Sequence, residues 1–75
     1  MALQQQLARA YEHIQASAST SWTVVHGLGI YPTIDVFIDY QGEKHKILPL
    51  AVTYVDKNTC TISFSVARTG MAVAS

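Results

Sequence analysis

The polar and apolar residues of this chain follow two different periods, and the first is helical. In the first 17 residues, apolar residues recur at spacings of four and three, which places them on one stripe of a helix. These residues are Leu3, Leu7, Ala10 (or Tyr11) and Ile14. Most of the intervening residues are strong helix formers such as glutamine and alanine. We therefore predict an α-helix over residues 1–17.

The predicted helix is short, and its role stays open between three alternatives. About two heptads make a helix that is only marginally stable in water unless its apolar stripe is buried. The stripe can pack on the rest of the same chain. It can instead form a short coiled-coil seam or dock on a partner, with an interface made of Leu3, Leu7, Ala10 and Ile14. The third alternative is a disordered tail.

The second period is two, and it begins at Trp22. Small residues over 18–21 precede it, and we interpret them as a linker. Alternation of apolar and polar residues is typical of a strand with one buried face. It is clearest over residues 59–66, where serine and threonine alternate with apolar residues. The apolar residues in this segment are Cys60, Ile62, Phe64 and Val66.

Turn signals divide the chain from Trp22 onward into about six short strands. The strands are predicted over residues 22–26, 33–39, 44–48, 52–55, 59–66 and 71–74. Turns are predicted at residues 40–43, 56–58 and 67–70. The expected fold is mainly β, a small antiparallel β-sandwich or barrel over residues 22–75, preceded by the N-terminal α-helix. Its predicted core consists of Trp22, Val24, His26, Ile34, Val36, Ile62 and Phe64.

Length and composition indicate that the domain needs partners. A chain of 75 residues buries a small share of its surface and depends on a staple or on association for stability. Cys60 is the only cysteine, so the chain has no internal disulfide, and no cysteine or histidine pair has zinc-finger spacing. Charged residues make up 13% of the chain and hydrophobic residues 49%, which predicts surplus apolar surface. We therefore expect a homo-oligomer.

The charge balance argues against other classes of partner. Five basic and five acidic residues cancel, whereas nucleic-acid binding and polybasic membrane binding both need a basic face. No apolar run approaches the ~18 residues of a membrane span. The N-terminus lacks the basic and apolar regions of a signal peptide. We expect neither nucleic acid nor membrane as a partner, and synthesis in a cytoplasm.

The reactive side chains form no catalytic or metal-binding pattern. The three histidines are scattered, and we expect His26 to lie in the core with its ring nitrogens hydrogen-bonded to loop backbone. Asp35 and Asp39 share a strand face but lie about 13 Å apart, too far to share a proton or a metal. We expect Asp39 and Asp56 to cap turns and Cys60 to behave as a small buried hydrophobe. We predict no catalytic residue, no metal site and no cofactor.

Three tyrosines stand at or near the predicted turns, namely Tyr31, Tyr40 and Tyr54. Aromatic side chains in such positions often anchor a bound sugar or a protein partner. The alternative is that they cover the core as lids.

A spaced series of residues from Trp22 onward carries a resemblance to a known family. The series reads Trp-x-Val-x-His-x-Leu-Gly, then Tyr-Pro, an Asp and a Gly at a hairpin, a Pro, and Val-x-Tyr-x-Asp-x-Asn-Thr before a final Gly. The matching residues, which cover about two-thirds of the chain, are Trp22, Val24, His26, Leu28, Gly29, Tyr31, Pro32, Ile34, Val36, Asp39, Gly42, Pro49, Val52, Tyr54, Asp56, Asn58, Thr59, Cys60, Ile62, Phe64 and Gly70. This series resembles a small β-domain of many tailed-phage virion proteins.

The resemblance implies a compact β-sandwich that serves as an attachment or decoration unit on fibres, baseplates, necks or capsids, without a known catalytic set. Two departures from the family pattern stand out. Many such domains are appended to long fibre proteins, whereas this chain is nearly the bare domain with a predicted helix. Cys60 also replaces an aliphatic residue, which we expect to change little because the core accepts a small apolar side chain.

We therefore expect a non-enzymatic virion structural protein of a bacteriophage that binds other virion proteins in the tail, neck or capsid. A homotrimer is favoured, because fibre and decoration proteins often have that symmetry. The alternative is a receptor- or carbohydrate-binding tip that uses Tyr31, Tyr40 and Tyr54. A small enzyme is disfavoured, because no paired acid and base or activated nucleophile is present.

Overall fold

The computed structural model describes residues 10–75, which form five strands and no helix. The strands are β1 (Tyr11–Val25), β2 (Ile34–Tyr40), β3 (Glu43–Ile47), β4 (Ala51–Asp56) and β5 (Thr59–Ala74). All of their pairings are antiparallel, so the predicted mainly β, antiparallel class is confirmed. None of the described residues belongs to a helix that could cross a membrane.

The N-terminal helix is not seen where the structure describes the chain. Residues 11–17, predicted as helix, and residues 18–21, predicted as linker, both lie within β1. From Tyr11 to Gln15 the side chains alternate between half-buried and exposed, and this segment pairs with the end of β5. Long-range pairing therefore outweighs local helix propensity here. Of the predicted helix interface, Ala10 is exposed before β1 and Ile14 is 65% exposed on it, while Leu3 and Leu7 lie outside the described residues.

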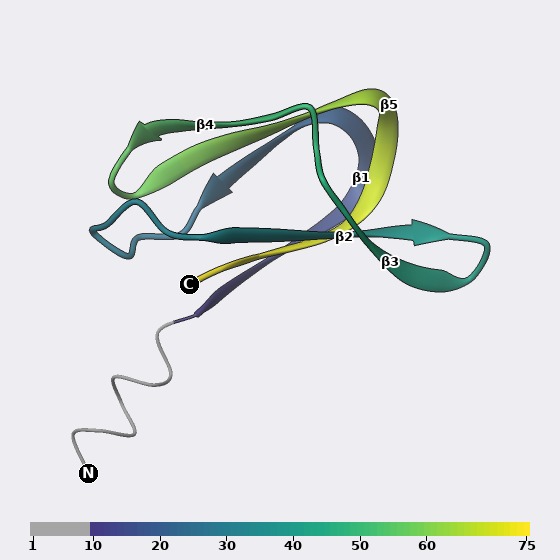
Figure 1. Ribbon diagram of the computed structural model, residues 1–75, viewed down its shortest axis with the longest axis horizontal. Helices are drawn as coiled ribbons and strands as arrows, with labels where there is room; N and C mark the ends of the chain where they lie inside the picture. The colour runs from purple at the N-terminus through teal and green to yellow at the C-terminus, as the bar shows by residue number, and fades with distance from the viewer. Residues whose placement is uncertain (1–9) are drawn as a thin grey trace, which may run out of the picture.

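β5 is the central strand, and its two halves have different neighbours. The first half lies between β1 and β4, because Thr61 pairs with Thr23 of β1 and with Thr53 of β4. The second half lies between β1 and β2, and Ala72 pairs with both. β3 extends the sheet beyond β2. The result is one five-stranded sheet with the order β1-β5-β2-β3 and with β4 beside β5 (Figure 1).

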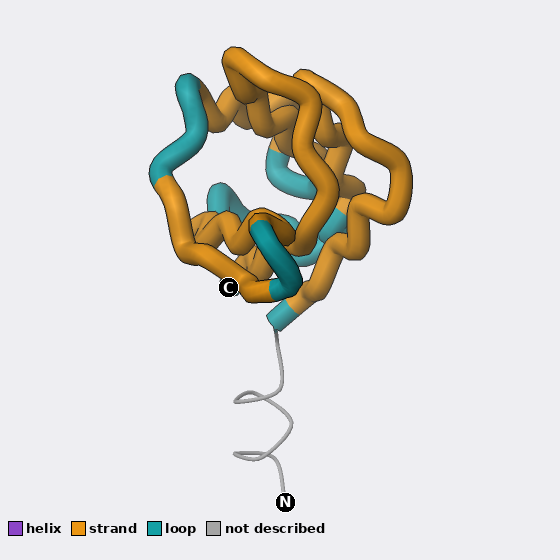
Figure 2. The backbone as a smooth tube through the Cα atoms, turned by 90° about the vertical axis from the view of Figure 1, so that its right-hand side faces the viewer, coloured by secondary structure: helices purple, strands orange, loops and turns teal. Residues whose placement is uncertain are grey.

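The ribbon formed by β1 and β5 is sharply bent. Gln15 pairs with Gly70 and Ser19 with Arg68, so the chain advances four residues on β1 but only two on β5. Ser21 pairs with Ser63, so the next step covers two residues on β1 and five on β5. Unpaired residues of this kind bend a ribbon. β5 therefore continues through residues 67–70, where we had predicted a turn, and the strand count falls to five. The strands curve around a common interior (Figure 2), as one bent sheet rather than as two separate sheets.

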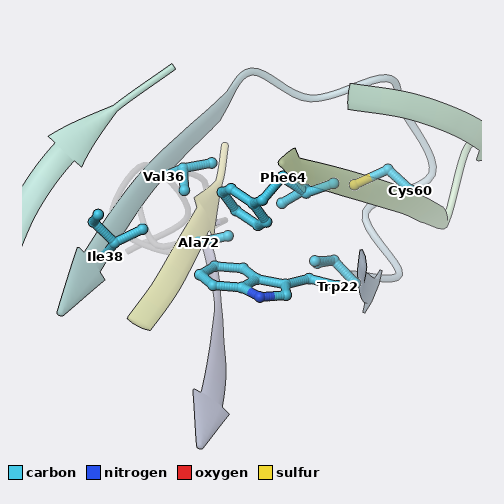
Figure 3. Close-up of a cluster of buried hydrophobic side chains, with 8 residues drawn as sticks. Trp22, Val36, Ile38, Cys60, Phe64 and Ala72 are labelled. Carbon is cyan, nitrogen blue, oxygen red and sulfur yellow. The ribbon is translucent and has the colours of Figure 1, made fainter. Parts of the chain in front are cut away.

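Apolar side chains from both halves of the bent sheet meet in one core. Its members are Trp22, Val24, Val36, Ile38, Cys60, Ile62, Phe64 and Ala72 (Figure 3). The rings of Trp22 and Phe64 lie 4.6 Å apart at a tilt of 53°, and the indole Nε1–H donates to the Arg68 carbonyl oxygen at 3.1 Å. Of the residues predicted for the core, all are buried except Ile34, which is half-buried and packs against the cluster.

At Gly70 the backbone of β2 lies very close to that of β5. Gly70 pairs with Ile38 of β2, and its φ of 154° lies in a region that side-chain-bearing residues rarely adopt. A Cβ atom at this position would overlap the Phe37 carbonyl oxygen and would lie 2.8 Å from the Ile38 Cα. The sequence places a glycine here because the backbone of β2 occupies the space of a side chain.

Candidate binding surfaces

The histidines and carboxylates are distributed over the sheet and do not converge. Among the described residues, no group of three His, Cys, Asp or Glu residues is placed to hold a metal ion. His13 on β1 contacts Gln15 at 2.7 Å and faces the Trp22 ring at 6.0 Å. His45 on β3 lies 3.3 Å from Glu43. Each of these contacts joins side chains of a single strand.

His26 is a core residue that holds the loop after β1. It is buried, and its Nδ1 accepts a hydrogen bond from the Leu28 backbone N–H at 3.0 Å. An accepting Nδ1 in a neutral ring places the proton on Nε2. This second nitrogen is buried and has no hydrogen-bond partner among the described residues. One of the two expected backbone hydrogen bonds is therefore present.

Cys60 faces the core from β5 (Figure 3) and is fully buried. Burial raises the pKa of its thiol, because the charged thiolate is disfavoured away from water. The thiolate is the nucleophilic form of cysteine. The Cys60 side chain is therefore suited to packing and not to covalent catalysis.

The aspartates make structural contacts. Asp56 accepts a hydrogen bond from the Asn58 backbone N–H at 2.8 Å, as expected for a turn cap. Asp39 instead joins three strands through side chains, because it pairs with Lys44 on β3 and accepts a 3.1 Å hydrogen bond from Thr69 on β5. The hydrogen bond from Lys44, followed by that from Thr69, lowers the pKa of Asp39. This carboxylate is a link between exposed strands.

The three predicted surface tyrosines separate into two places. The rings of Tyr31 and Tyr54 lie 5.5 Å apart in an edge-to-face arrangement, and we call them the tyrosine pair. The Tyr54 hydroxyl donates to the Pro32 carbonyl oxygen at 2.5 Å, which fixes its ring, while Tyr31 stays 60% exposed. Tyr40 lies at the β2–β3 hairpin, where its ring is 5.8 Å from His45. A surface made of all three tyrosines is therefore not formed.

A second surface lies at the bend of β5, and the sequence analysis missed it. The loop between β3 and β4 and the bend form an open pocket of about 260 Å³, which is lined by Ile47, Leu48, Pro49, Leu50, Phe64, Ser65, Val66 and Arg68. Leu48 is 95% exposed, Leu50 71% and Val66 56%. We call these three residues the leucine surface. The available signal was the apolar sequence Ile-Leu-Pro-Leu in a loop, where polar residues are usual.

The leucine surface is held in place by the sheet. The Leu50 backbone N–H donates to the Ser63 carbonyl oxygen at 2.9 Å, so the loop is tied to β5 directly beside the pocket. Phe64 lines the pocket and also belongs to the core. An apolar partner side chain that enters this pocket would therefore meet a surface that is continuous with the core.

Comparison of the chain with protein-family models, with curated proteins and with solved structures gave no match.

Proposed function

We propose that this chain is a non-enzymatic structural protein of a bacteriophage virion, which attaches to or decorates the tail, neck or capsid by burying apolar surface against other virion proteins. The observation that carries the proposal is the leucine surface, with two leucines more than two-thirds exposed beside a pocket that Phe64 of the core also lines. Complete burial of one such side chain contributes ~1.5–3 kcal/mol. Exposed apolar patches of this kind mark sites of protein association.

The family resemblance supports the same assignment. Several residues of the recurring pattern have structural tasks in the bent sheet, such as Trp22 in the core, His26 at the loop and Gly70 at the close approach. We extend the proposal to the fold, as a small β-sandwich whose two layers are the halves of one bent sheet. The protein would be made in the host cytoplasm, would self-associate and would end in the virion.

The segment before β1 is the second docking element of the proposal. Leu3 and Leu7 supply its apolar side chains. A deletion that tests this segment should stop before Tyr11, where β1 begins, because a longer deletion would remove strand residues that pair with β5.

Charge placed on the leucine surface should prevent incorporation into particles. In a phage that encodes the double variant Leu48→Asp/Leu50→Asp, we expect the copy number of the protein per purified particle to fall at least about tenfold, because an interface cannot bury two carboxylates without partners. Both side chains are exposed, so the circular dichroism of the isolated variant should not change. Quantitative mass spectrometry of purified particles measures the copy number.

The matched control is Val55→Asp, which places a carboxylate at another exposed apolar residue, 62% accessible on β4. It should incorporate at the normal level. Normal incorporation of the double leucine variant would contradict the proposal that the leucine surface docks on the particle.

The tyrosine pair favours a second candidate function, the binding of a carbohydrate or receptor. An exposed aromatic pair, in which the Tyr54 hydroxyl is bonded to the Pro32 carbonyl oxygen, is a suitable platform for a sugar ring. A glycan array should then show reproducible binding that Tyr31→Ala abolishes and Tyr40→Ala leaves unchanged, since Tyr40 is exposed elsewhere on the molecule. An array without signal for the unmodified protein would exclude this function for the glycans tested.

A further inference from the structure

β1 is an edge strand that carries no protective charge from His13 onward. Among the described strands it pairs only with β5, and from His13 to Val25 its sequence contains no Asp, Glu, Lys, Arg or Pro. Natural edge strands usually carry charges or proline, which discourage pairing with other chains. The other end of the sheet follows that rule, because β3 contains Glu43, Lys44 and Lys46. The unprotected edge of β1 therefore calls for an explanation.

The direction of the hydrogen-bonding groups of β1 follows from its neighbour. In an antiparallel ladder, successive residues direct their N–H and C=O groups to opposite sides. The Ser63 carbonyl of β5 accepts from Leu50 and so points toward β4. Ser21 on β1 is the partner of Ser63, so its backbone N–H and C=O groups must point away from β5. The same holds for every second residue after Ser21, because the register is regular from Ser21 to Val25. Thr23 and Val25 direct their N–H and C=O groups to the open edge.

Ser21 differs from the other two outward-pointing residues because a side chain occupies its backbone groups. The Ser19 hydroxyl accepts from the Ser21 N–H at 3.1 Å and donates to the Ser21 carbonyl oxygen at 2.9 Å. No such contact engages the outward groups of Thr23 and Val25 within residues 10–75. Both side chains are exposed, that of Val25 by 61%. The open edge is thus a short segment with two free donors and two free acceptors.

We propose that two copies of the chain pair through this edge, antiparallel, with Val24 at the two-fold axis. In this register Thr23 of one copy lies opposite Val25 of the other, and each such pair exchanges two hydrogen bonds. The two pairs satisfy all the free groups and leave the Ser19 cap intact. The exposed Val25 side chain then packs beside Thr23 of the second copy, as cross-strand neighbours on one face do.

A second copy fits this edge better than it fits the charged edge of β3. Self-pairing of β1 brings no charges together, whereas antiparallel self-pairing of β3 about His45 would place Lys44 opposite Lys46 of the second copy. The proposed pairing also joins the outer faces of two sheets into one continuous surface. The proposed pairing gives a dimer in place of the trimer expected from the sequence. This dimer does not require that the protein belongs to a virion.

The first test removes the free donor of Thr23. Because this N–H points away from β5, Thr23→Pro leaves the β1–β5 ladder intact, and we expect a dissociation constant at least about tenfold weaker in sedimentation equilibrium, since two of the four hydrogen bonds are lost. The control is Lys46→Pro. The two-residue turn at Gln41 and Gly42 sets the β2–β3 register so that the Lys46 N–H also faces an open edge. This variant should dimerise normally.

The second test fixes the register and does not depend on how well a proline variant folds. Residues opposite each other in a hydrogen-bonded pair have Cα atoms ~5.5 Å apart, which suits a disulfide. Thr23→Cys mixed with Val25→Cys should therefore give a cross-linked dimer on oxidation. Each variant alone should cross-link poorly, because identical residues lie ~7–8 Å apart on the diagonal. Cys60 is buried and should not compete.

Three results would overturn the proposal. The first is a single species of 8.2 kDa at high micromolar concentration. The second is a dimer that Thr23→Pro leaves unchanged. The third is a mixture of the two cysteine variants that cross-links no better than either alone. Loss of dimerisation in Leu48→Asp/Leu50→Asp together with normal dimerisation in Thr23→Pro would assign self-association to the leucine surface instead.

Discussion

Replacement of Gly70 by alanine should remove a large part of the free energy of unfolding of the protein at room temperature. The new Cβ would overlap the Phe37 carbonyl oxygen, and the φ of 154° would be strained for any residue with a side chain. The backbone strain alone costs of order 1–3 kcal/mol, and the separation of β2 from β5 that relieves the overlap adds to it. We expect a total loss of about 3 kcal/mol or more, a large part of the stability of a domain this small. Urea unfolding monitored by Trp22 fluorescence measures it.

The control for this prediction is a glycine that has positive φ but open space around it. Gly29 has a φ of 72°, and no heavy atom lies within 4 Å of a Cβ added there. Gly29→Ala should therefore cost only the left-handed backbone penalty of ~1–2 kcal/mol. Equal losses for the two variants would show that the approach of β2 to β5 is not what makes Gly70 necessary.

Truncation of Trp22 to alanine should be as damaging for a different reason. Trp22 is fully buried, and its ring packs against Phe64 between the two halves of the sheet. Removal of a buried tryptophan side chain costs about 3–5 kcal/mol through lost burial and the cavity that remains. The Arg68 carbonyl also loses the hydrogen bond from the indole. Far-ultraviolet circular dichroism against temperature should show a thermal midpoint lowered by more than about 15 °C or no folded baseline.

The variant Trp22→Phe separates packing from hydrogen bonding. Phenylalanine keeps an aromatic ring beside Phe64 but cannot donate to Arg68, so we expect a smaller loss than for alanine. A thermal midpoint of Trp22→Ala close to that of the unmodified protein would mean that the core does not depend on this side chain.

Local pattern was sufficient where a strand or turn is defined by its own residues. The alternation over residues 59–66 lies within β5 and holds as far as Phe64, whereas Val66, expected on the buried face, is exposed at the bend. The predicted turns at 40–43 and 56–58 join neighbouring strands. The error at residues 11–17 has a physical origin. Tyr11 becomes a strand residue because it pairs with Ala74, a partner at the far end of the sequence that no local pattern reveals. Over so few residues, a helical period and a period of two can both be fitted.

Predictions from the sequence were also wrong where one residue type can have several structural roles. Gly70 indicated a turn at residues 67–70, but it lies inside the continuous strand β5, where the backbone of β2 leaves no space for a side chain. Leu48 and Leu50 flank Pro49, where the predicted strand over residues 44–48 has ended, and their exposure became visible once the bend of β5 was known. The separation of Tyr40 from the tyrosine pair likewise follows from the sheet order.

The pairing of β1 with β5 sets the order in which the chain can fold. The hairpin of β4 and β5 is local, because Asp56 and Thr59 close it across a two-residue turn. β1 can pair only after β5 has been made, since Val25 pairs with Thr59 and Tyr11 with Ala74. Closing such long loops costs chain entropy before any contact repays it, which slows folding. On the ribosome, the first strand to be made would therefore be among the last to be paired, and its uncharged edge would stay available to other chains throughout synthesis.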